Sequence, residues 1–382
     1  MFWTFVILAW TLLHVYVFVR AASVPWIARN VSRRALAAIG AVLWGSVFLL
    51  RTFGHDGSGA VARAVELIGM TWLAVLFLIA VCLLVVDVIT GFGLVLRGTA
   101  RALRGRALVA GLALSVIALV QGVRPPVVRE HGVPIAGLPL SADGTVLVAI
   151  SDLHVGGLLG RDWLAARVAQ VEALHGDVVV LLGDIFEGHG QPESELVATL
   201  RGLSAPHGVF AVTGNHESHG GYREGSRALE DAGFTVLHDR WVEVRPGLVL
   251  AGVDDLTSRH RSGLDGDPIA RALAGRPVGA VVLLSHTPWD AEEASRLGAG
   301  LMLAGHTHDG QIWPFDVLVR TVYPLMGGRY EVAGMPVIVC RGTGTWGPRM
   351  RLWRPAEILR ITLRATQSGQ RSARGAEAPR RP

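Results

Sequence analysis

The stretch Val-Leu-Val-Ala-Ile-Ser-Asp-Leu-His, residues 146–154, decides the fold of this chain. Its first five residues are apolar and have the length of a buried strand. Asp152 and His154 follow that strand, and side chains two residues apart on extended backbone point the same way. A carboxylate and an imidazole that converge at a strand end indicate a metal site. On its own, the pair fits a solvated loop equally well.

Four more expected strands end in residues of the same kind. These residues are Asp184 after strand 178–182, Asn215 and His216 after 209–212, His286 after 280–284, and His306 and His308 after 301–304. Further strands are expected over 248–253, 337–341 and 358–363. Any one of these side chains fits a solvated loop. Five such sets in chain order, each at a strand end, are poorly explained by chance.

The segments between these strands predict helices. Leu164, Val168, Val171 and Leu174 recur at helical intervals, and residues 193–203 have the pattern of a more polar helix. Alternating strands and helices predict an α/β sandwich with its site at the carboxyl ends of the strands.

The candidate ligands are oxygen and nitrogen donors without a thiolate, which suits Mn, Fe, Zn, Co or Ni. Seven residues supply them: Asp152, His154, Asp184, Asn215, His286, His306 and His308. Seven ligands are too many for one tetrahedral ion, so two divalent ions are the natural interpretation. Two ions about 3.5–4 Å apart hold both the attacking and the leaving oxygen of an in-line phosphoryl displacement.

In this order, Asp-x-His, Gly-Asp, Gly-Asn-His-Glu, Ser-His and Gly-His-x-His resemble the motifs of the calcineurin-like metallophosphoesterases. The versions Ser-His-Thr-Pro-Trp-Asp and Gly-His-Thr-His-Asp-Gly-Gln resemble the bacterial branch that carries N-terminal membrane segments. The resemblance covers about residues 145–363 and implies a four-layer α/β/β/α sandwich. Asp309 departs from this branch, which often has glycine there, and we expect it to alter the rim of the site without changing a ligand.

The resemblance also implies a role for each residue. One ion would be bound by Asp152, His154 and His308, the other by Asn215, His286 and His306, with Asp184 as the bridge. His216 would lie near the leaving group without binding metal. A water or hydroxide held between the ions would attack phosphorus, and protonated His216 would act as general acid. Asp255 and Glu217 are two candidates to orient His216.

The first part of the chain has the composition of a membrane module. The protein is 51% hydrophobic and 18% charged over 382 residues, and its apolar excess lies in the first 125. Apolar runs cover 2–19, 35–50, 65–90 and 107–121, and a span of about 30 Å needs about 20 such residues. The first run lacks the basic region of a signal peptide. The expected domains are an all-α transmembrane module of four helices (1–122), a linker or irregular first strand (123–144), the catalytic domain (145–364) and a disordered basic tail (365–382).

Charged residues give the module an orientation. Arginines concentrate in the first and third loops between apolar runs, and such loops stay cytoplasmic. We therefore expect an integral protein of the bacterial cell membrane with an extracytoplasmic catalytic domain. With three or five helices instead of four, the catalytic domain would lie on the other side of the membrane. All 36 basic residues are arginine, and membrane topology explains the net charge of +5 better than a nucleic-acid partner does. His14 and Asp87 lie near predicted helix ends, where we expect interfacial solvation.

Several other residues are expected to have no part in the chemistry. Cys82 and Cys340 form no disulfide framework. Residues 342–347, Gly-Thr-Gly-Thr-Trp-Gly, do not meet the phosphate-loop rule, although the resemblance implies a place beside the site. Arg349 and Arg351 would meet a phosphate or lipid headgroup, or be solvated. The histidines outside the motifs are interpreted as surface residues: His175, His189, His207, His219, His238 and His260.

Together these observations predict a membrane-anchored, dinuclear-metal phosphoesterase that hydrolyses phosphate mono- or diesters, of a lipid or an envelope precursor. The alternative is a non-catalytic membrane sensor with a phosphoesterase-like ligand-binding domain. The complete ligand set favours the enzyme. Metal identity, ester class and oligomeric state are left open by the sequence.

Overall fold

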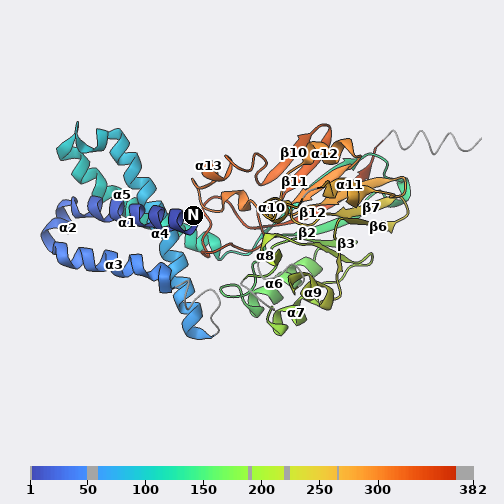
Figure 1. Ribbon diagram of the computed structural model, residues 1–382, viewed down its shortest axis with the longest axis horizontal. Helices are drawn as coiled ribbons and strands as arrows, with labels where there is room; N and C mark the ends of the chain where they lie inside the picture. Colours follow the sequence, from blue (N-terminus) through green and yellow to red (C-terminus); the bar gives the residue numbers. More distant parts are fainter. Residues whose placement is uncertain (1, 50–58, 188–191, 219–223, 265, 367–382) are drawn as a thin grey trace, which may run out of the picture. The chain divides into compact units, whose positions relative to one another are not determined.

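The computed structural model describes residues 2–49, 59–187, 192–218, 224–264 and 266–366 (Figure 1). The chain divides into two units. The helical unit comprises Met1–Arg124 and Gly347–Trp353, and the sheet unit comprises Pro125–Trp346 and Arg354–Pro382. Residues 367–382 of the expected basic tail, His189 and His219 lie outside the described residues.

The helical unit contains a helix at each of the four apolar runs. Its helices are α1 (Phe2–Ala22), α2 (Pro25–Asn30), α3 (Arg33–Leu49), α4 (Ala60–Ile89), η2 (Gly91–Gly93) and α5 (Arg97–Gly122). Among the described residues, α4 and α5 are long and apolar enough to cross a membrane, whereas the apolar stretch Val6–Ala22 of α1 is shorter. Two of the four expected spans therefore meet the length requirement.

Asp87 and His14 are buried inside the helical unit, so the expectation of interfacial solvation is wrong. Asp87 is 0% exposed, and its carboxylate lies 2.6 Å from Arg20 Nε and 2.7 Å from an Arg104 guanidinium nitrogen. Helices α1 and α5 each place an arginine against α4. The two arginines pair with the Asp87 carboxylate, which therefore does not depend on water for its partners. His14 accepts a hydrogen bond from Trp72 Nε1 at 3.0 Å.

The sheet unit contains two six-stranded mixed sheets. The first has the order β1-β12-β2-β3-β4-β5 and the second β10-β11-β9-β8-β7-β6. The strands of the first are β1 (Val127–Ile135), β12 (Glu357–Ala365), β2 (Val146–Ile150), β3 (Val178–Leu182), β4 (Val209–Val212) and β5 (Thr235–Val236). Those of the second are β10 (Gly328–Val332), β11 (Met335–Val339), β9 (Leu301–Ala304), β8 (Ala280–Leu284), β7 (Leu248–Gly252) and β6 (Arg240–Arg245). All eight expected strands are present.

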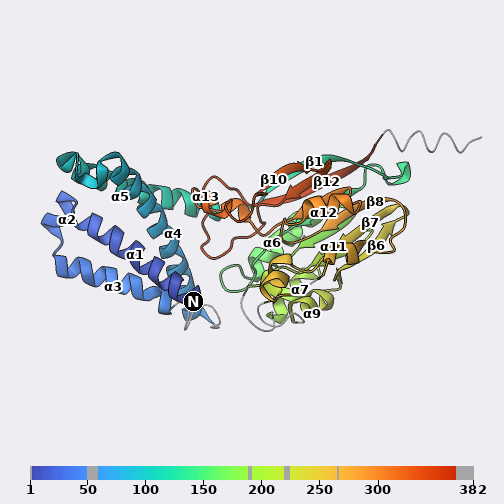
Figure 2. The same ribbon diagram turned by 45° about the horizontal axis from the view of Figure 1, so that its top comes forward.

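The two sheets pack face to face with helices on their outer faces. Along β3, Val178, Val180 and Leu182 join the core between the sheets, while Val179 and Leu181 face a second core that includes residues of α6, α7 and α9. These helices are α6 (Arg161–Glu172), α7 (Ser194–Leu200) and α9 (Glu224–Asp231), and α7 and α9 lie together in both views (Figures 1 and 2). A third core holds α10 (Leu256–Arg261), α11 (Pro268–Leu273) and α12 (Ala291–Arg296) against the second sheet. The four-layer α/β/β/α sandwich is confirmed.

The stretch expected to be a linker, residues 123–144, contains β1. This strand pairs in parallel with β12 along its whole length, from Val127 opposite Glu357 to Ile135 opposite Ala365. Pro134 fits because β1 is the edge strand of its sheet, where a missing N–H breaks no ladder. The irregular first strand, rather than the linker, describes residues 127–135.

A short segment of the C-terminal half belongs to the helical unit. Arg351 N donates to Ala118 O at 2.9 Å, and Trp353 N donates to Gln121 Oε1 at 2.8 Å. Met350, Arg351 and Leu352 are fully buried. Arg351 is therefore not the solvated arginine that the sequence allowed, and the helical unit is built from two separate parts of the chain.

Candidate metal centre

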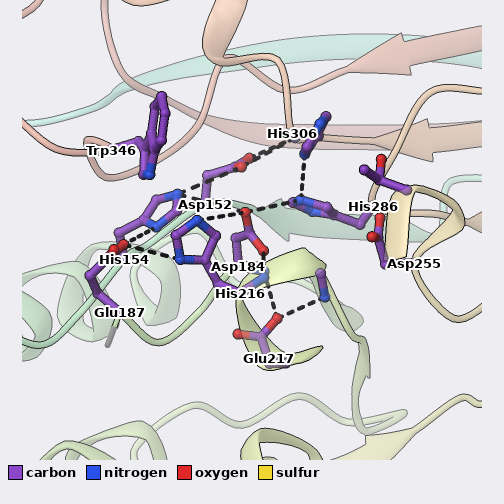
Figure 3. Close-up of polar contacts among 12 residues, drawn as sticks. Asp152, His154, Asp184, Glu187, His216, Glu217, Asp255, His286, His306 and Trp346 are labelled. Atoms are coloured by element: carbon purple, nitrogen blue, oxygen red, sulfur yellow. Dashed lines mark hydrogen bonds and ion pairs between the residues drawn. The ribbon is translucent and has the colours of Figure 1, made fainter. Parts of the chain in front are cut away.

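The candidate ligands lie in the loops that follow five strands, and Figure 3 shows five of them converging: Asp152, His154, Asp184, His286 and His306. In the first sheet, β2 leads to Asp152 and His154, β3 to Asp184, and β4 to Asn215 at the start of helix α8 (Asn215–Ser218). In the second sheet, β8 leads to His286, and β9 leads to His306 and to His308 in the 3₁₀ turn η4 (His308–Gly310). Parallel pairing within each sheet places these carboxyl ends at one edge.

Asp152, His154 and His308 form the first cluster. The two Nε2 atoms of His154 and His308 are 3.1 Å apart, and His308 Nε2 lies 3.4 Å from Asp152 Oδ1. Ligand atoms bound to one ion at about 2.0–2.2 Å lie roughly 3 Å from one another. This spacing fits the coordination sphere of one metal ion.

Asp184, His286 and His306 form the second cluster. His286 Nε2 lies 3.1 Å from Asp184 Oδ2 and 3.1 Å from His306 Nδ1. His286 Nδ1 donates to Leu182 O at 2.7 Å, which leaves the Nε2 lone pair directed into the cluster. Asp184 Oδ2 is also 3.9 Å from His154 Nε2, so this carboxylate lies between the two clusters.

Asn215 supplies an independent indication of a cation. Its side chain is 7% exposed, and Oδ1 has no hydrogen-bond partner among the described residues. A buried carbonyl oxygen without a partner is costly unless an ion or water binds it. The residues present therefore fit a metal ion at this position.

The charge balance of the site also favours cations. Burial raises the pKa of Asp152, and the neighbouring Asp184 raises it further. Burial acts in the same direction on Asp184, but His286 and His216 overcome it and hold its pKa well below the usual value. Carboxylates this deeply buried need positive charge close by, and divalent ions would provide it.

Comparisons with known proteins agree with this geometry. The family model described as calcineurin-like phosphoesterase matches residues 145–310. An uncharacterized metallophosphoesterase of Aquifex aeolicus is 31% identical over 242 residues, which cover 62% of this chain and 91% of that protein. The chain belongs to the calcineurin-like metallophosphoesterase family. The matched residues, 145–310, form the phosphoesterase domain of that family.

Two vertebrate relatives are named as transmembrane proteins with a metallophosphoesterase domain. The one from Danio rerio is 34% identical over 270 residues, covering 68% of this chain and 62% of that protein. The one from Bos taurus is 34% identical over 268 residues, covering 66% of this chain and 60% of that protein. The chain thus spans about three fifths of the length of these relatives. In this chain, α4 and α5 are the described helices that are long and apolar enough to cross a membrane.

The backbone at the ligands is left-handed rather than extended. Asp152 and His154 have φ values of 52° and 47°, and Asp184, His306 and His308 also have positive φ. Our expectation that Asp152 and His154 converge through strand alternation is therefore wrong. Left-handed non-glycine residues cost free energy and gather at functional sites, and here they turn the ligands inward.

His216 and Glu187 form a pair beside the first cluster (Figure 3). Glu187 Oε2 lies 3.4 Å from His216 Nδ1 and 2.6 Å from His154 Nδ1, so one carboxylate orients both rings. Glu187 was not among the residues predicted from the sequence. Its one signal there is that an acidic residue follows Asp184 by three positions. His216 Nε2 lies 4.0 Å from Asp184 Oδ2. Since His216 also forms a possible ligand group with His154 and Asp184, its exclusion from metal binding stays a prediction.

Glu217 and Asp255, the two expected partners of His216, have other tasks. Glu217 is buried, and its carboxylate accepts the backbone amides of Asp184, Ile185, Phe186 and Gly214 at 2.7–3.1 Å. It therefore joins the loops after β3 and β4. Asp255 accepts from Thr287 Oγ1 at 2.6 Å, next to His286 in the chain.

The glycine-rich loop and Asp309 support the ligand loops from outside. Thr343 N and Gly344 N donate to the carbonyls of Ser151 and Asp152, at 2.7 and 3.0 Å. The loop thus holds the backbone of the first ligand rather than a phosphate. Asp309 is buried and pairs with Arg341 Nε at 3.0 Å and Arg354 Nε at 3.3 Å. We had expected Asp309 to alter the rim of the site. Its carboxylate does not line the rim and instead ties the His308 loop to the C-terminal strands.

Tyr323 is a further contact that the sequence did not reveal. Its hydroxyl lies 2.8 Å from His306 Nε2, the ring nitrogen turned away from His286. Trp289 stacks on the Tyr323 ring with a centroid distance of 5.5 Å. A partner on the outer nitrogen fixes the ring orientation of a ligand histidine.

Proposed function

We propose that this protein is a membrane-anchored phosphoesterase with two divalent ions, which hydrolyses phosphate mono- or diesters of a lipid or an envelope precursor. One observation carries the proposal: two ligand clusters lie on either side of a single carboxylate, Asp184. Asp152, His154 and His308 would hold one ion, and Asn215, His286 and His306 the other. Asp184 would bridge them.

The ions, when bound, lower the pKa of a water molecule and offset the charge on the phosphoryl oxygens. The chain itself supplies the orientation and the proton. His216 is proposed as the general acid that protonates the leaving alkoxide from Nε2. Glu187, whose Oε2 lies 3.4 Å from Nδ1, holds the ring in place. Glu217 and the loop around Thr343 keep the ligand backbone fixed.

The direct test uses the full-length protein in detergent with Mn²⁺ added. Release of p-nitrophenol is measured from p-nitrophenyl phosphate and from bis-p-nitrophenyl phosphate, with bound metal quantified on the same sample. We expect about two ions per chain and hydrolysis of at least one ester. Absence of both activities while metal remains bound would favour a ligand-binding sensor instead.

The proposed orientation places the sheet unit outside the cytoplasm of a bacterial cell. With an even number of spans, two or four, both ends of the helical unit lie on the same side of the membrane. Arginine-rich loops favour the cytoplasmic side, so both ends lie on the opposite side. A reporter fused to the C-terminus and active only in the cytoplasm should be silent. An active cytoplasmic reporter would reverse the orientation.

A further inference from the structure

A surface beside the metal centre exposes six large apolar side chains, each between 38% and 60% accessible to solvent. We call this set the apolar rim: Trp313, Phe315, Val317, Leu318, Val322 and Trp346. Five of the six lie in one stretch between β9 and β10, which includes the short helix α13 (Asp316–Val319). Exposed apolar residues are ordinary when single, whereas a group of them marks an interaction site.

Polar contacts fix the apolar rim to the metal-ligand loops. Gln311, three residues after His308, accepts from Trp346 N at 2.9 Å and donates to Trp346 O at 3.0 Å. At the other end of the stretch, Tyr323 contacts His306. Trp346 lies above His154 in Figure 3. The surface is therefore held next to the place where a substrate phosphate would bind.

The helical unit indicates what covers this surface. The membrane-length helix α5 ends at Gly122, and β1 begins at Val127. Trp346 is likewise followed directly by residues of the helical unit. The sheet unit is thus joined to membrane helices by very short connections. Tryptophan and phenylalanine with aliphatic neighbours and an exposed arginine, here Arg320, are the residue types that enter the interfacial layer of a bilayer.

We propose that the apolar rim docks on the surface of a phospholipid bilayer and thereby presents the metal centre to phosphate esters of membrane lipids. The lipid-substrate part rests on the proposed function, whereas the docking part does not. Soluble esters would reach the centre without the rim, and lipid esters would need it.

Docking is tested on the full-length protein in nanodiscs that hold one chain each, with Cys82 replaced by alanine. An environment-sensitive fluorophore is attached at Leu318→Cys, or at Val278→Cys, a fully exposed position of the same unit. Lipids with a spin label on the acyl chain should quench the first fluorophore several-fold more than the second. Equal, weak quenching at both positions would overturn docking, and one chain per disc excludes shielding by a second copy.

Lipid use is tested by replacing Val317, Leu318 and Val322 with serine. The matched control replaces Leu264 and Val278, which are exposed elsewhere on the sheet unit. Hydrolysis of p-nitrophenyl esters is compared with hydrolysis of phosphatidic acid and phosphatidylglycerol in the discs. We expect the rim variant to keep its activity on soluble esters within about twofold and to lose at least about tenfold on lipid esters. The control should keep both.

The outcomes separate the two proposals. If the rim variant and the control hydrolyse lipid esters equally, or if the wild type cleaves soluble esters but no lipid, the lipid-substrate part is wrong. If no ester of either kind is cleaved while metal is bound, the proposed function fails, and the quenching result still decides docking.

Discussion

His216 stands out among the residues of the centre because its two ring nitrogens have different neighbours. Nδ1 lies 3.4 Å from Glu187 Oε2, and Nε2 lies 4.0 Å from Asp184 Oδ2. A ring held in this way is suited to deliver a proton from Nε2. Its importance should therefore depend on how much the leaving group needs that proton.

We expect His216→Ala to retain both ions and to slow hydrolysis of an alkyl phosphate ester by about 10²–10⁴-fold. The effect on p-nitrophenyl phosphate should be smaller, because nitrophenolate leaves readily without a proton. Steady-state kinetics on the two esters, with metal analysis, measure both effects. Loss of an ion would instead show that His216 is a ligand.

Asp184 is the carboxylate that lies between the clusters. Asp184→Ala should remove both ions together, whereas Asp152→Ala should remove only the ion of the first cluster. Elemental analysis of the purified, folded variants gives the answer directly. An Asp184→Ala variant that keeps one ion at full occupancy would rule out a bridging role.

Gly305 allows the end of β9 to approach the end of β2. A Cβ atom at this position would lie 2.6 Å from Asp152 Oδ2 and would also collide with the Ser151 side chain. Gly305→Ala should therefore displace Asp152 and lower activity by at least about a hundredfold, as misplaced ligands do. Gly132→Ala is the matched control, since a Cβ there meets nothing within 4 Å. Normal metal content and activity in Gly305→Ala would contradict this account.

The residues that stand in sequence motifs were predictable from the sequence. The residues that act by contacting a motif residue were not. Asp152 and His308 stand in short patterns at strand ends, and the chemistry of their side chains explains the pattern. Glu187 and Tyr323 act only through contacts with His154, His216 and His306. Such contacts depend on loop conformations, including left-handed residues, that a linear pattern does not contain.

At the scale of elements, the sequence missed strands β5, β6 and β10 and offered β1 only as an alternative to a linker. These four strands are the edges of the two sheets. Central strands are buried on both faces and therefore appear as continuous apolar runs, as β3 does. Edge strands need less apolar surface: β6 has no buried residue, and β5 is two residues long. Their pairing, rather than their composition, makes them strands.

The link between α9 and the end of β7 predicts a pH dependence of stability. His238 Nε2 lies 2.8 Å from Ser226 Oγ of α9, and Nδ1 lies 2.6 Å from Asp254 Oδ1. The hydrogen bond to Asp254 raises the pKa of His238 above 6.5 in the folded protein. The resulting stabilisation is fully present below pH 6.5 and is lost as the pH rises through the folded-state pKa.

The expected difference in Tm between wild type and His238→Gln is therefore largest below pH 6.5 and shrinks toward pH 9. Thermal unfolding of the two proteins across this pH range measures the Tm difference. The metal-ligand histidines affect the Tm of both proteins alike, so their effect cancels in the difference. A Tm difference that is constant or grows with pH would contradict the ion pair.

At the scale of the whole molecule, dividing the chain at one position does not separate the helical unit from the sheet unit, because each unit contains two parts of the chain. Met350 and Leu352 are fully buried and belong to the helical unit, although they follow the glycine-rich loop of the sheet unit. A chain shortened to begin at Pro125 would expose both side chains. We expect it to aggregate, and Met350→Ser with Leu352→Ser to restore a monomer, as judged by size-exclusion chromatography with light scattering. A monomeric unmodified fragment would disprove this.

The same segment, Gly347–Trp353, also constrains the order in which the protein is made. A ribosome releases the helices first, yet Ala118 and Gln121 of α5 obtain these partners only just before the last strand, β12, is synthesised. The helical unit must therefore wait, incompletely packed, while nearly the whole metal-binding domain is produced. A stop codon shortly before residue 347 would damage the part of the protein that was translated earliest.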